Sequence, residues 1–377
     1  MKYIVNGKII MPDNILENKA LVYDNKIIDI IDQEEVPHNA DIIDAGGGYI
    51  SPGLIDIHIH GYHGADVSDG NADGIRKIAE GIVKNGVTSW CPTTMTVSSE
   101  EIDTALTVVR SLKEKSKEWN GAEILGVNLE GPFINPEKKG AQAAEHIKPL
   151  DPQFIIDNAD NIALTTVAPE MDNNVAEIEK IVEECNVKVA IGHSGATYEE
   201  AIAAINAGAT HINHLFNAQT PLNHRNPGVV GAALTTDVSC ELICDTFHIH
   251  KGLFSLIAKL KKEKLVLITD CTRAGGMSDG EYTLGGQKII VSGVKCLLED
   301  GTIAGSVLKL NCAVKNMRDN TNIPLYEIVA AASINAATVI GEDKRKGSLE
   351  KGKDADIIIT DNDFNVLKTI INGKQVY

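Results

Sequence analysis

The chain has 377 residues, of which 43% are hydrophobic and 23% charged, and its formal net charge is −17. This composition provides enough apolar residues for a sizeable core, and the length fits one large barrel or two domains. The acidic excess argues against a nucleic-acid partner or an anionic membrane surface, because both require basic protein surfaces. No apolar stretch is long enough to predict a membrane span.

Short β-strands are predicted at both ends of the chain. Residues 1–52 alternate apolar runs with turn signals, and Asn6-Gly7 predicts a hairpin between its flanking strands. Residues 346–377 have the same character, with a predicted strand at 355–360 and a hairpin over 366–374. Because chain termini commonly lie close together, we expect both ends to complete one small β-sandwich.

The central residues, 53–345, alternate strands with amphipathic helices. Helices are predicted at 74–84, 100–118, 174–185, 198–207, 251–262, 306–318 and 324–337. Strands are predicted at 54–60, 86–91, 124–130, 162–168, 187–193, 209–214, 240–245 and 265–270. Eight strands in this alternation predict an α/β fold, a (β/α)8 TIM barrel, with a β-rich insertion near 281–302.

The first barrel strand carries side chains that could bind a metal ion. Strand alternation places Asp56, His58 and His60 on one face. Two imidazoles on one side of a strand can bind one ion, although an isolated His-x-His pair more often has a structural role. Asp56 either orients one of these imidazoles or is a hydrogen-bonded carboxylate inside the barrel.

Polar residues also end, or closely follow, five other predicted strands, namely Glu130, His193, His214, His248 and Asp270. Active sites of such barrels lie at the C-terminal ends of the strands, so we expect these residues to converge with the His pair. Imidazoles and carboxylates suit zinc, iron(II), manganese or cobalt. Asp270 beside a metal-activated water could take its proton and later deliver it to a leaving group.

The ligand number is sufficient for two ions. His58, His60 and Asp270 would hold one ion, His193 and His214 the other, and Glu130 would bridge them. Other polar residues have simpler interpretations. We expect a structural role for His211, a solvated loop position for His63, packing for Cys271, and solvated charge runs at 261–262 and 344–346.

Five motifs carry a resemblance to a known family. They are residues 52–61 (PGLIDIHIHG), 129–133 (LEGPF), 192–197 (GHSGAT), 214–218 (HLFNA) and 269–270 (TD). With these motifs the chain resembles the amidohydrolase superfamily and, within it, the N-acetylglucosamine-6-phosphate deacetylases, over essentially its whole length. The resemblance implies hydrolysis of N-acetyl-D-glucosamine 6-phosphate to acetate and glucosamine 6-phosphate.

The resemblance also implies roles for individual residues. Glu130, His193 and His214 match the ligands found in all members, and Asp270 matches the catalytic base. His58 and His60 match the extra pair of two-metal members, which implies two divalent ions per subunit. Matched substrate contacts are Asn217, Ala218, His248, Ile303, Ala304 and Gly305.

Two positions bear on the substrate in particular ways. Arg225 matches a phosphate-binding arginine that serves the neighbouring subunit, which implies a homodimer; His224 beside it either assists or takes no part. Where some members have a substrate-contacting His, this chain has Ala141 and Gln142. We expect Gln142 to hydrogen-bond the substrate, although an amide cannot act as a protonated electrophile.

Several alternatives remain open at this point. They are deacetylation of the galactosamine epimer, another amidohydrolase activity such as an acylase of N-acylated amino acids, and a non-catalytic metal-binding role. Asp270 argues against the non-catalytic role, because a protein that only binds metal does not require a general base. Seven scattered cysteines without a CxxC pair, together with an N-terminus that lacks a signal-peptide pattern, indicate a reducing cytoplasm.

Overall fold

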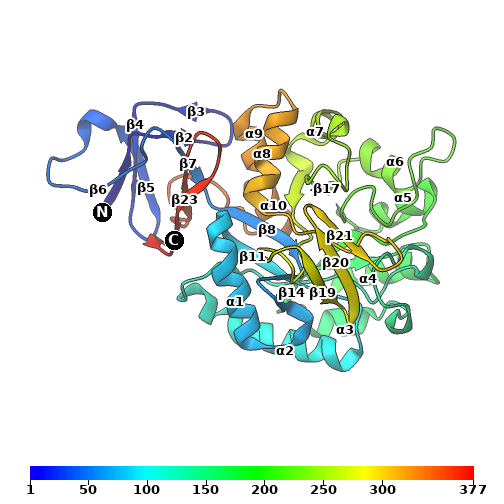
Figure 1. Ribbon diagram of the computed structural model, residues 1–377. Helices are drawn as coiled ribbons and strands as arrows, with labels where there is room; N and C mark the ends of the chain where they lie inside the picture. Colours follow the sequence, from blue (N-terminus) through cyan, green and yellow to red (C-terminus); the bar gives the residue numbers. More distant parts are fainter.

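The predicted parallel barrel is confirmed in the computed structural model, which describes all 377 residues (Figure 1). Its strands are β8 (Leu54–Ile59), β11 (Val87–Thr94), β12 (Glu123–Ile124) with β13 (Val127–Leu129), β14 (Ile162–Val167), β15 (Lys188–Ile191), β16 (His211–Ile212), β17 (Ser239–Ile243) and β18 (Leu265–Ile268). The barrel closes between the ends of β18 and β8 through three backbone hydrogen bonds of 2.9 Å, from Asp270 N to His58 O and from His60 N and Gly61 N to Cys271 O.

Helices surround the barrel strands (Figure 1). They are α1 (Ala72–Ile82), α2 (Ser99–Lys113), α3 (Pro152–Asp157), α4 (Asn174–Glu184), α5 (Tyr198–Asn206), α6 (Gly228–Thr235), α7 (Phe254–Lys261), α8 (Leu310–Asn320), α9 (Leu325–Ala331) and α10 (Ile334–Ile340). None is both long and apolar enough to cross a membrane. The helix predicted over 324–337 is two helices, because Ser333 has a non-helical backbone (φ −144°, ψ −89°) between them.

Helices α3 and α6 were not predicted from the sequence, and the reasons differ. Helix α3 has only six residues, which is too short to establish a helical period. Helix α6 reads GVVGAALT, and its first six residues are all buried. A helix that is apolar on every side has no amphipathic pattern to detect.

The two ends of the chain form a separate β-sandwich. One sheet has the order β5-β4-β1-β6, and the other, β24-β23-β22-β7-β2-β3, combines strands from both termini. Their bounds are β1 (Lys2–Val5), β2 (Lys8–Ile10), β3 (Ile15–Leu16), β4 (Lys19–Tyr23), β5 (Ile27–Asp32), β6 (Asp41–Asp44), β7 (Tyr49–Pro52), β22 (Ile357–Thr360), β23 (Val366–Ile371) and β24 (Lys374–Gln375). A core of 12 buried residues lies between the sheets, apart from the 84-residue core of the barrel. The domain boundaries at residues 52 and 346 stay a prediction.

The hairpin predicted at Asn6-Gly7 is wrong. Strand β1 pairs with β4 and β6, whereas β2 pairs with β3 and β7 in the other sheet. Ile4 and Ile9 are both fully buried in the core between the sheets. The turn therefore carries the chain from one layer to the other, because both strands must face the same core.

The predicted insertion contains a three-stranded antiparallel sheet, β19 (Gly280–Leu284), β20 (Gln287–Ser292) and β21 (Lys295–Leu298). A second short ribbon, β9 (Gly61–Tyr62) with β10 (Ala65–Asp66), follows the first barrel strand. Both follow the end of a barrel strand, the ribbon after β8 and the three-stranded sheet after β18, and the latter is labelled in Figure 1.

The prediction that the charge runs at 261–262 and 344–346 are solvated is wrong for one residue in each. Lys346 is 1% exposed, and its Nζ lies 2.6 Å from Asp356 Oδ2 and 2.8 Å from Glu123 Oε2. Lys261 is also buried, and its Nζ donates to two backbone carbonyl oxygens. A buried cation is tolerated when acceptors surround it, which the spacing of charges along the sequence does not reveal.

Candidate metal centre and active site

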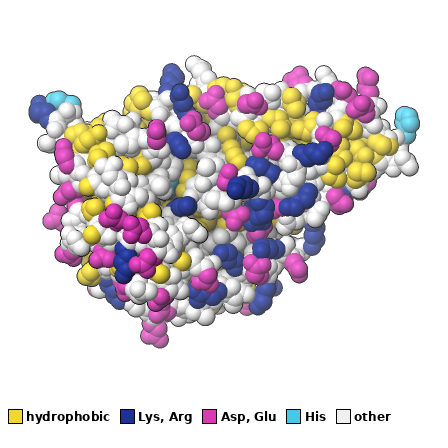
Figure 2. All heavy atoms as spheres, turned by 180° about the vertical axis from the view of Figure 1, so that it is seen from behind, with side chains coloured by type: hydrophobic (Ala, Val, Ile, Leu, Met, Phe, Trp, Pro, Cys, Tyr) yellow, Lys and Arg dark blue, Asp and Glu magenta, His cyan; other side chains and the backbone are white.

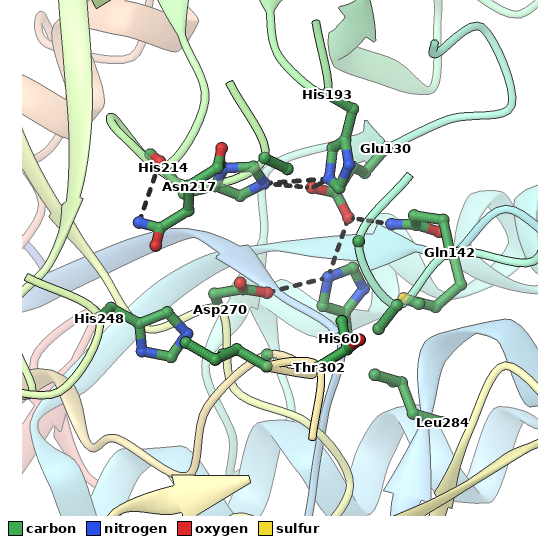
Figure 3. Close-up of a pocket in the computed structure, with 16 residues that line it drawn as sticks. His60, Glu130, Gln142, His193, His214, Asn217, His248, Asp270, Leu284 and Thr302 are labelled. Atoms are coloured by element: carbon green, nitrogen blue, oxygen red, sulfur yellow. Dashed lines mark hydrogen bonds and ion pairs between the residues drawn. The ribbon is translucent and has the colours of Figure 1, made fainter. Parts of the chain in front are cut away.

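The C-terminal ends of the barrel strands bring all six predicted metal ligands together. The ligand atoms of His58, His60 and Asp270 lie within 4.8 Å of one another, and those of Glu130, His193 and His214 form a second such group. All six residues are buried. In Figure 3 the side chains of five of them turn toward a common centre.

Two of these residues sit on backbone turns that non-glycine residues rarely adopt. His193 has a φ of 47° and Asp270 a φ of 50°, both in the left-handed region. Such conformations cost energy and cluster at functional sites. Each directs its side chain across the barrel mouth immediately after the strand ends, which a continuing strand would not do.

Glu130 is the centre of the arrangement. Its Oε1 lies 2.9 Å from His214 Nε2, 3.2 Å from His193 Nε2 and 3.4 Å from His58 Nε2. Its Oε2 lies 3.2 Å from His60 Nε2. Burial alone would raise the pKa of this carboxyl, but the surrounding imidazoles outweigh burial and hold the pKa well below its usual range. Glu130 is therefore a carboxylate that contacts both groups.

The other nitrogen of each imidazole faces an oxygen acceptor. The contacts are His58 Nδ1 to Glu241 Oε2 (2.9 Å), His60 Nδ1 to Thr93 O (3.2 Å), His193 Nδ1 to Lys138 O (2.9 Å) and His214 Nδ1 to Asn217 O (3.2 Å). Carbonyl and carboxylate oxygens cannot donate, so each Nδ1 carries the proton. In a neutral ring, each Nε2 then presents a lone pair toward Glu130.

These lone pairs fit a divalent metal. His58 Nε2 is buried without a hydrogen-bond partner, and the Nε2 atoms of His193 and His214 lie only 3.1 Å apart. Burial lowers the pKa of His60, but hydrogen bonds to Asp270 and Glu130 outweigh it and raise the pKa to about 9. Protons or a cation must therefore sit among these groups, and metal binding releases such protons. Imidazole and carboxylate donors suit borderline divalent ions.

Glu241 is a buried contributor that the sequence analysis missed. Its Oε2 accepts from His58 Nδ1 and from His214 N, both at 2.9 Å, and its Oε1 lies 3.1 Å from His211 Nε2. It thus contacts one ligand residue from each group. The available signal was a carboxylate inside an otherwise apolar strand, which requires buried partners. His211 lies behind Glu241, outside both ligand groups, as expected for a structural residue.

Asp56 contacts no imidazole. It accepts hydrogen bonds from Thr269 Oγ1 at 2.6 Å and from the backbone N–H groups of His58 and Thr269, both at 3.3 Å. Burial raises its pKa to about 7, although these hydrogen bonds act in the opposite direction. Of its two predicted roles, the structure supports the hydrogen-bonded carboxylate inside the barrel, where it joins the first strand to the last.

A pocket of about 270 Å³ opens above the metal centre. Predicted substrate contacts that line it are Ala141, Gln142, Asn217, Ala218, His248, Ile303 and Gly305. Ala304 is fully buried outside the lining. Four lining residues were not predicted, namely Met95, Gly140, Leu284 and Thr302. Met95 follows strand β11 but is apolar, and the other three belong to a loop and to the insertion, which have no pattern of polar strand ends.

Two polar side chains in the pocket are held in fixed orientations. Gln142 accepts from Thr96 N at 2.7 Å through Oε1, and its Nε2 donates to Glu130 Oε2 at 2.6 Å. His248 Nδ1 lies 2.6 Å from Asp245 Oδ2. The amide of Gln142 thus points toward the metal ligands, and the ring of His248 lies at the pocket wall (Figure 3).

Arg225 does not line this pocket. It lies with His224 on an exposed loop before α6, and its Nη1 is 2.8 Å from His224 Nε2. The loop before α6 projects from the molecule in Figure 1, and Figure 2 shows a histidine beside a basic side chain at the edge opposite the β-sandwich. Within one chain, the predicted phosphate-binding residue therefore stands outside the pocket.

Comparisons with known proteins identify the family of this chain. A model of the amidohydrolase family matches residues 49–376. The chain belongs to the amidohydrolase family. It is 38% identical to an N-acetylglucosamine-6-phosphate deacetylase of Bacillus subtilis, over 98% of this chain and 95% of the relative. It is 37% identical to an N-acetylgalactosamine-6-phosphate deacetylase of Escherichia coli O157:H7, over 86% and 87%.

Solved structures extend the likeness to the amidohydrolase fold in three dimensions. The N-acetylglucosamine-6-phosphate deacetylase of Pasteurella multocida superposes with a TM-score of 0.95 at 35% identity, over 99% of each chain. A mutant of the enzyme from Mycobacterium smegmatis, in complex with N-acetyl-D-glucosamine-6-phosphate, gives a TM-score of 0.92 at 28% identity. That comparison covers 100% of this amidohydrolase and 99% of the mutant enzyme.

The Glu241 contacts predict a metal-binding defect in Glu241→Gln. The amide presents one donor group to neighbours that are themselves donors, so His58 loses its fixed tautomer. We expect divalent-metal affinity to fall about 10- to 100-fold, measured by competition with a chelator. Thermal unfolding of chelator-treated wild type and variant is the control for loss of fold. Unchanged metal affinity would contradict this role of Glu241.

Proposed function

We propose that this amidohydrolase hydrolyses N-acetyl-D-glucosamine 6-phosphate to glucosamine 6-phosphate and acetate. The observation that carries the proposal is the group of six buried ligands at the floor of a pocket lined by polar residues. Relatives that match nearly the full chain bear the name of this activity. An amide is a poor electrophile with a poor leaving group, so its hydrolysis calls for an activated water and a proton donor.

The ligand residues divide into two proposed ion sites. His58, His60 and Asp270 would hold one ion and His193 with His214 the second, and the Glu130 carboxylate contacts imidazoles of both groups. Bound divalent ions supply Lewis acidity, which activates water and polarises the amide carbonyl. Zinc, iron(II), manganese and cobalt all suit these donors.

Asp270 moves the proton. Its Oδ1 lies 3.1 Å from His60 Nε2, and the residue also lines the pocket. Burial raises the pKa of Asp270, but the hydrogen bond from His60 and nearby imidazole charge outweigh burial and lower the pKa. A bound cation in place of these imidazole protons would also favour the ionised carboxylate, so Asp270 could take a proton from the attacking water. It then delivers that proton to the departing amine of glucosamine 6-phosphate.

The remaining contacts orient the sugar. Asn217 and Ala218 follow His214 at the pocket wall, and His248 is held there by Asp245. The fixed amide of Gln142 presents its donor beside Glu130, where it can hydrogen-bond the substrate. Ile303, Ala304 and Gly305 form the loop on which the substrate rests.

We assign the phosphate to Arg225 of a second subunit. Arg225 stands exposed and outside its own chain's pocket, and a guanidinium binds phosphate in a bidentate manner. The enzyme in this proposal is a homodimer in which each Arg225 reaches the neighbouring pocket. His224, 2.8 Å from the guanidinium, positions it. A cytoplasmic location suits the seven free cysteines.

Asp270→Asn tests the proposed proton transfer. Loss of the general base and acid should lower kcat at least about 10²-fold, because proton transfer contributes roughly 10²–10⁴ in such reactions. The metal content of the variant should stay close to that of the wild type, because the other five ligands remain. Asp245→Asn is the matched control: it disturbs His248 and should raise KM more than it lowers kcat. Near-wild-type activity in Asp270→Asn would remove Asp270 from its assigned role.

Arg225→Ala tests the proposed phosphate contact. If Arg225 binds phosphate, the variant should lose most of the preference for N-acetylglucosamine 6-phosphate over N-acetylglucosamine, through a raised KM rather than a lowered kcat. Wild-type protein should behave as a dimer in sedimentation. A fully active monomer would contradict the assignment across subunits.

Measuring the turnover of two substrates decides between the C4 epimers, N-acetylglucosamine 6-phosphate and N-acetylgalactosamine 6-phosphate. One relative of similar identity is named for the galactosamine substrate, so both 6-phosphates are compared side by side. Much slower turnover of the gluco epimer would overturn the proposed substrate while leaving the amide chemistry intact.

A further inference from the structure

The pocket has a polar side and an opposite side that combines apolar side chains with the Gln142 amide. Asn217 and His248 lie on one side of Asp270 and His60, whereas Leu284 and Gln142 lie on the other (Figure 3). Met95 also lines the pocket and follows directly on strand β11. Neither Met95 nor Leu284 has a role in the chemistry described above.

The apolar side is a fixed wall. Met95 is 2% exposed and Leu284 1%, so neither side chain is free to swing into solvent. A Cβ placed on Gly285 would lie 3.8 Å from Met95 Cε, which shows that the turn after Leu284 packs against Met95. Leu284 pairs across the hairpin with Gln287, whose Nε2 donates to Ala141 O at 2.5 Å. This bond ties the hairpin to the loop that carries Gln142.

The substrate has a matching division. On one side of the scissile amide stands the sugar, with hydroxyl groups that require polar partners; on the other stands a methyl group that has none. If the sugar lies toward Asn217 and His248, the acyl group points toward Met95 and Leu284. Placing the methyl group on the polar side would leave hydroxyl groups against apolar carbon, which is unfavourable.

We propose that Met95 and Leu284 form an acyl-binding wall that restricts this enzyme to short N-acyl groups, acetyl above all. The inference rests on the proposed function and adds the specificity of its leaving acyl group. Apolar pockets discriminate between acyl groups that differ by one methylene by about 10- to 200-fold. Here the wall sets an upper limit, because both side chains are almost fully buried and the turn after Leu284 packs against Met95.

The test compares three substrates, the N-acetyl, N-propanoyl and N-butanoyl forms of glucosamine 6-phosphate. Each is hydrolysed by water to glucosamine 6-phosphate and the corresponding carboxylate, so release of the free amine reports all three. Wild-type holoenzyme should prefer acetyl over butanoyl by at least about 10-fold in kcat/KM. Leu284→Ala should raise the butanoyl-to-acetyl ratio at least about 10-fold, because it removes side-chain carbon from the wall.

Leu298→Ala is the matched control, since Leu298 belongs to strand β21 of the same sheet but does not line the pocket. The butanoyl-to-acetyl ratio of Leu298→Ala in kcat/KM should equal that of the wild type. Met95→Ala, on a different element, provides an independent second variant if Leu284→Ala folds poorly. Unchanged ratios in both pocket variants, or a wild type that hydrolyses all three substrates equally, would overturn the acyl-binding wall. Failure of the wild type to release any acetate would instead overturn the proposed function.

Discussion

The contact of one carboxylate with four imidazole nitrogens is the constraint on which the rest of the site depends. Glu130 lies within 3.4 Å of all four Nε2 atoms, and the carbonyl or carboxylate behind each ring fixes the proton on Nδ1. Lone pairs and negative charge cannot share a buried space without a cation. The barrel closure between β18 and β8, the buried Glu241 and the bond from Asp56 to Thr269 all hold these donors in place.

Different structural elements supply the residues proposed for catalysis and those proposed for substrate binding. Rigid strand ends supply the metal ligands and Asp270, where small displacements would be costly. Loops and the β19–β21 insertion supply the pocket walls, including Gln142 and Leu284. The proposed phosphate contact, Arg225, stands on an exposed loop outside its own pocket. In a barrel of this kind, substitutions in the loops that line the pocket can alter substrate specificity while the metal ligands at the strand ends stay the same.

Much of this arrangement could be predicted from the sequence, because period and strand-end position carry strong signals. The alternation of strands and helices predicted the barrel, and polar residues at strand ends predicted the group from His58 to Asp270 that the structure brings together. The misses have physical causes. Glu241 and Lys346 depend on partners distant in the chain, α6 is apolar on every side, and Asn6-Gly7 fixes a turn without fixing which strands pair. Met95 and Leu284 meet only through tertiary packing of the insertion.

Metal stoichiometry tests the central claim most directly. Protein purified without chelator and incubated separately with zinc, iron(II), manganese or cobalt is desalted and analysed by inductively coupled plasma mass spectrometry. The two ligand groups predict about two tightly bound divalent ions per chain. A folded protein that retains none of these ions would contradict this prediction, because the converging lone pairs around Glu130 would then have no cation to hold.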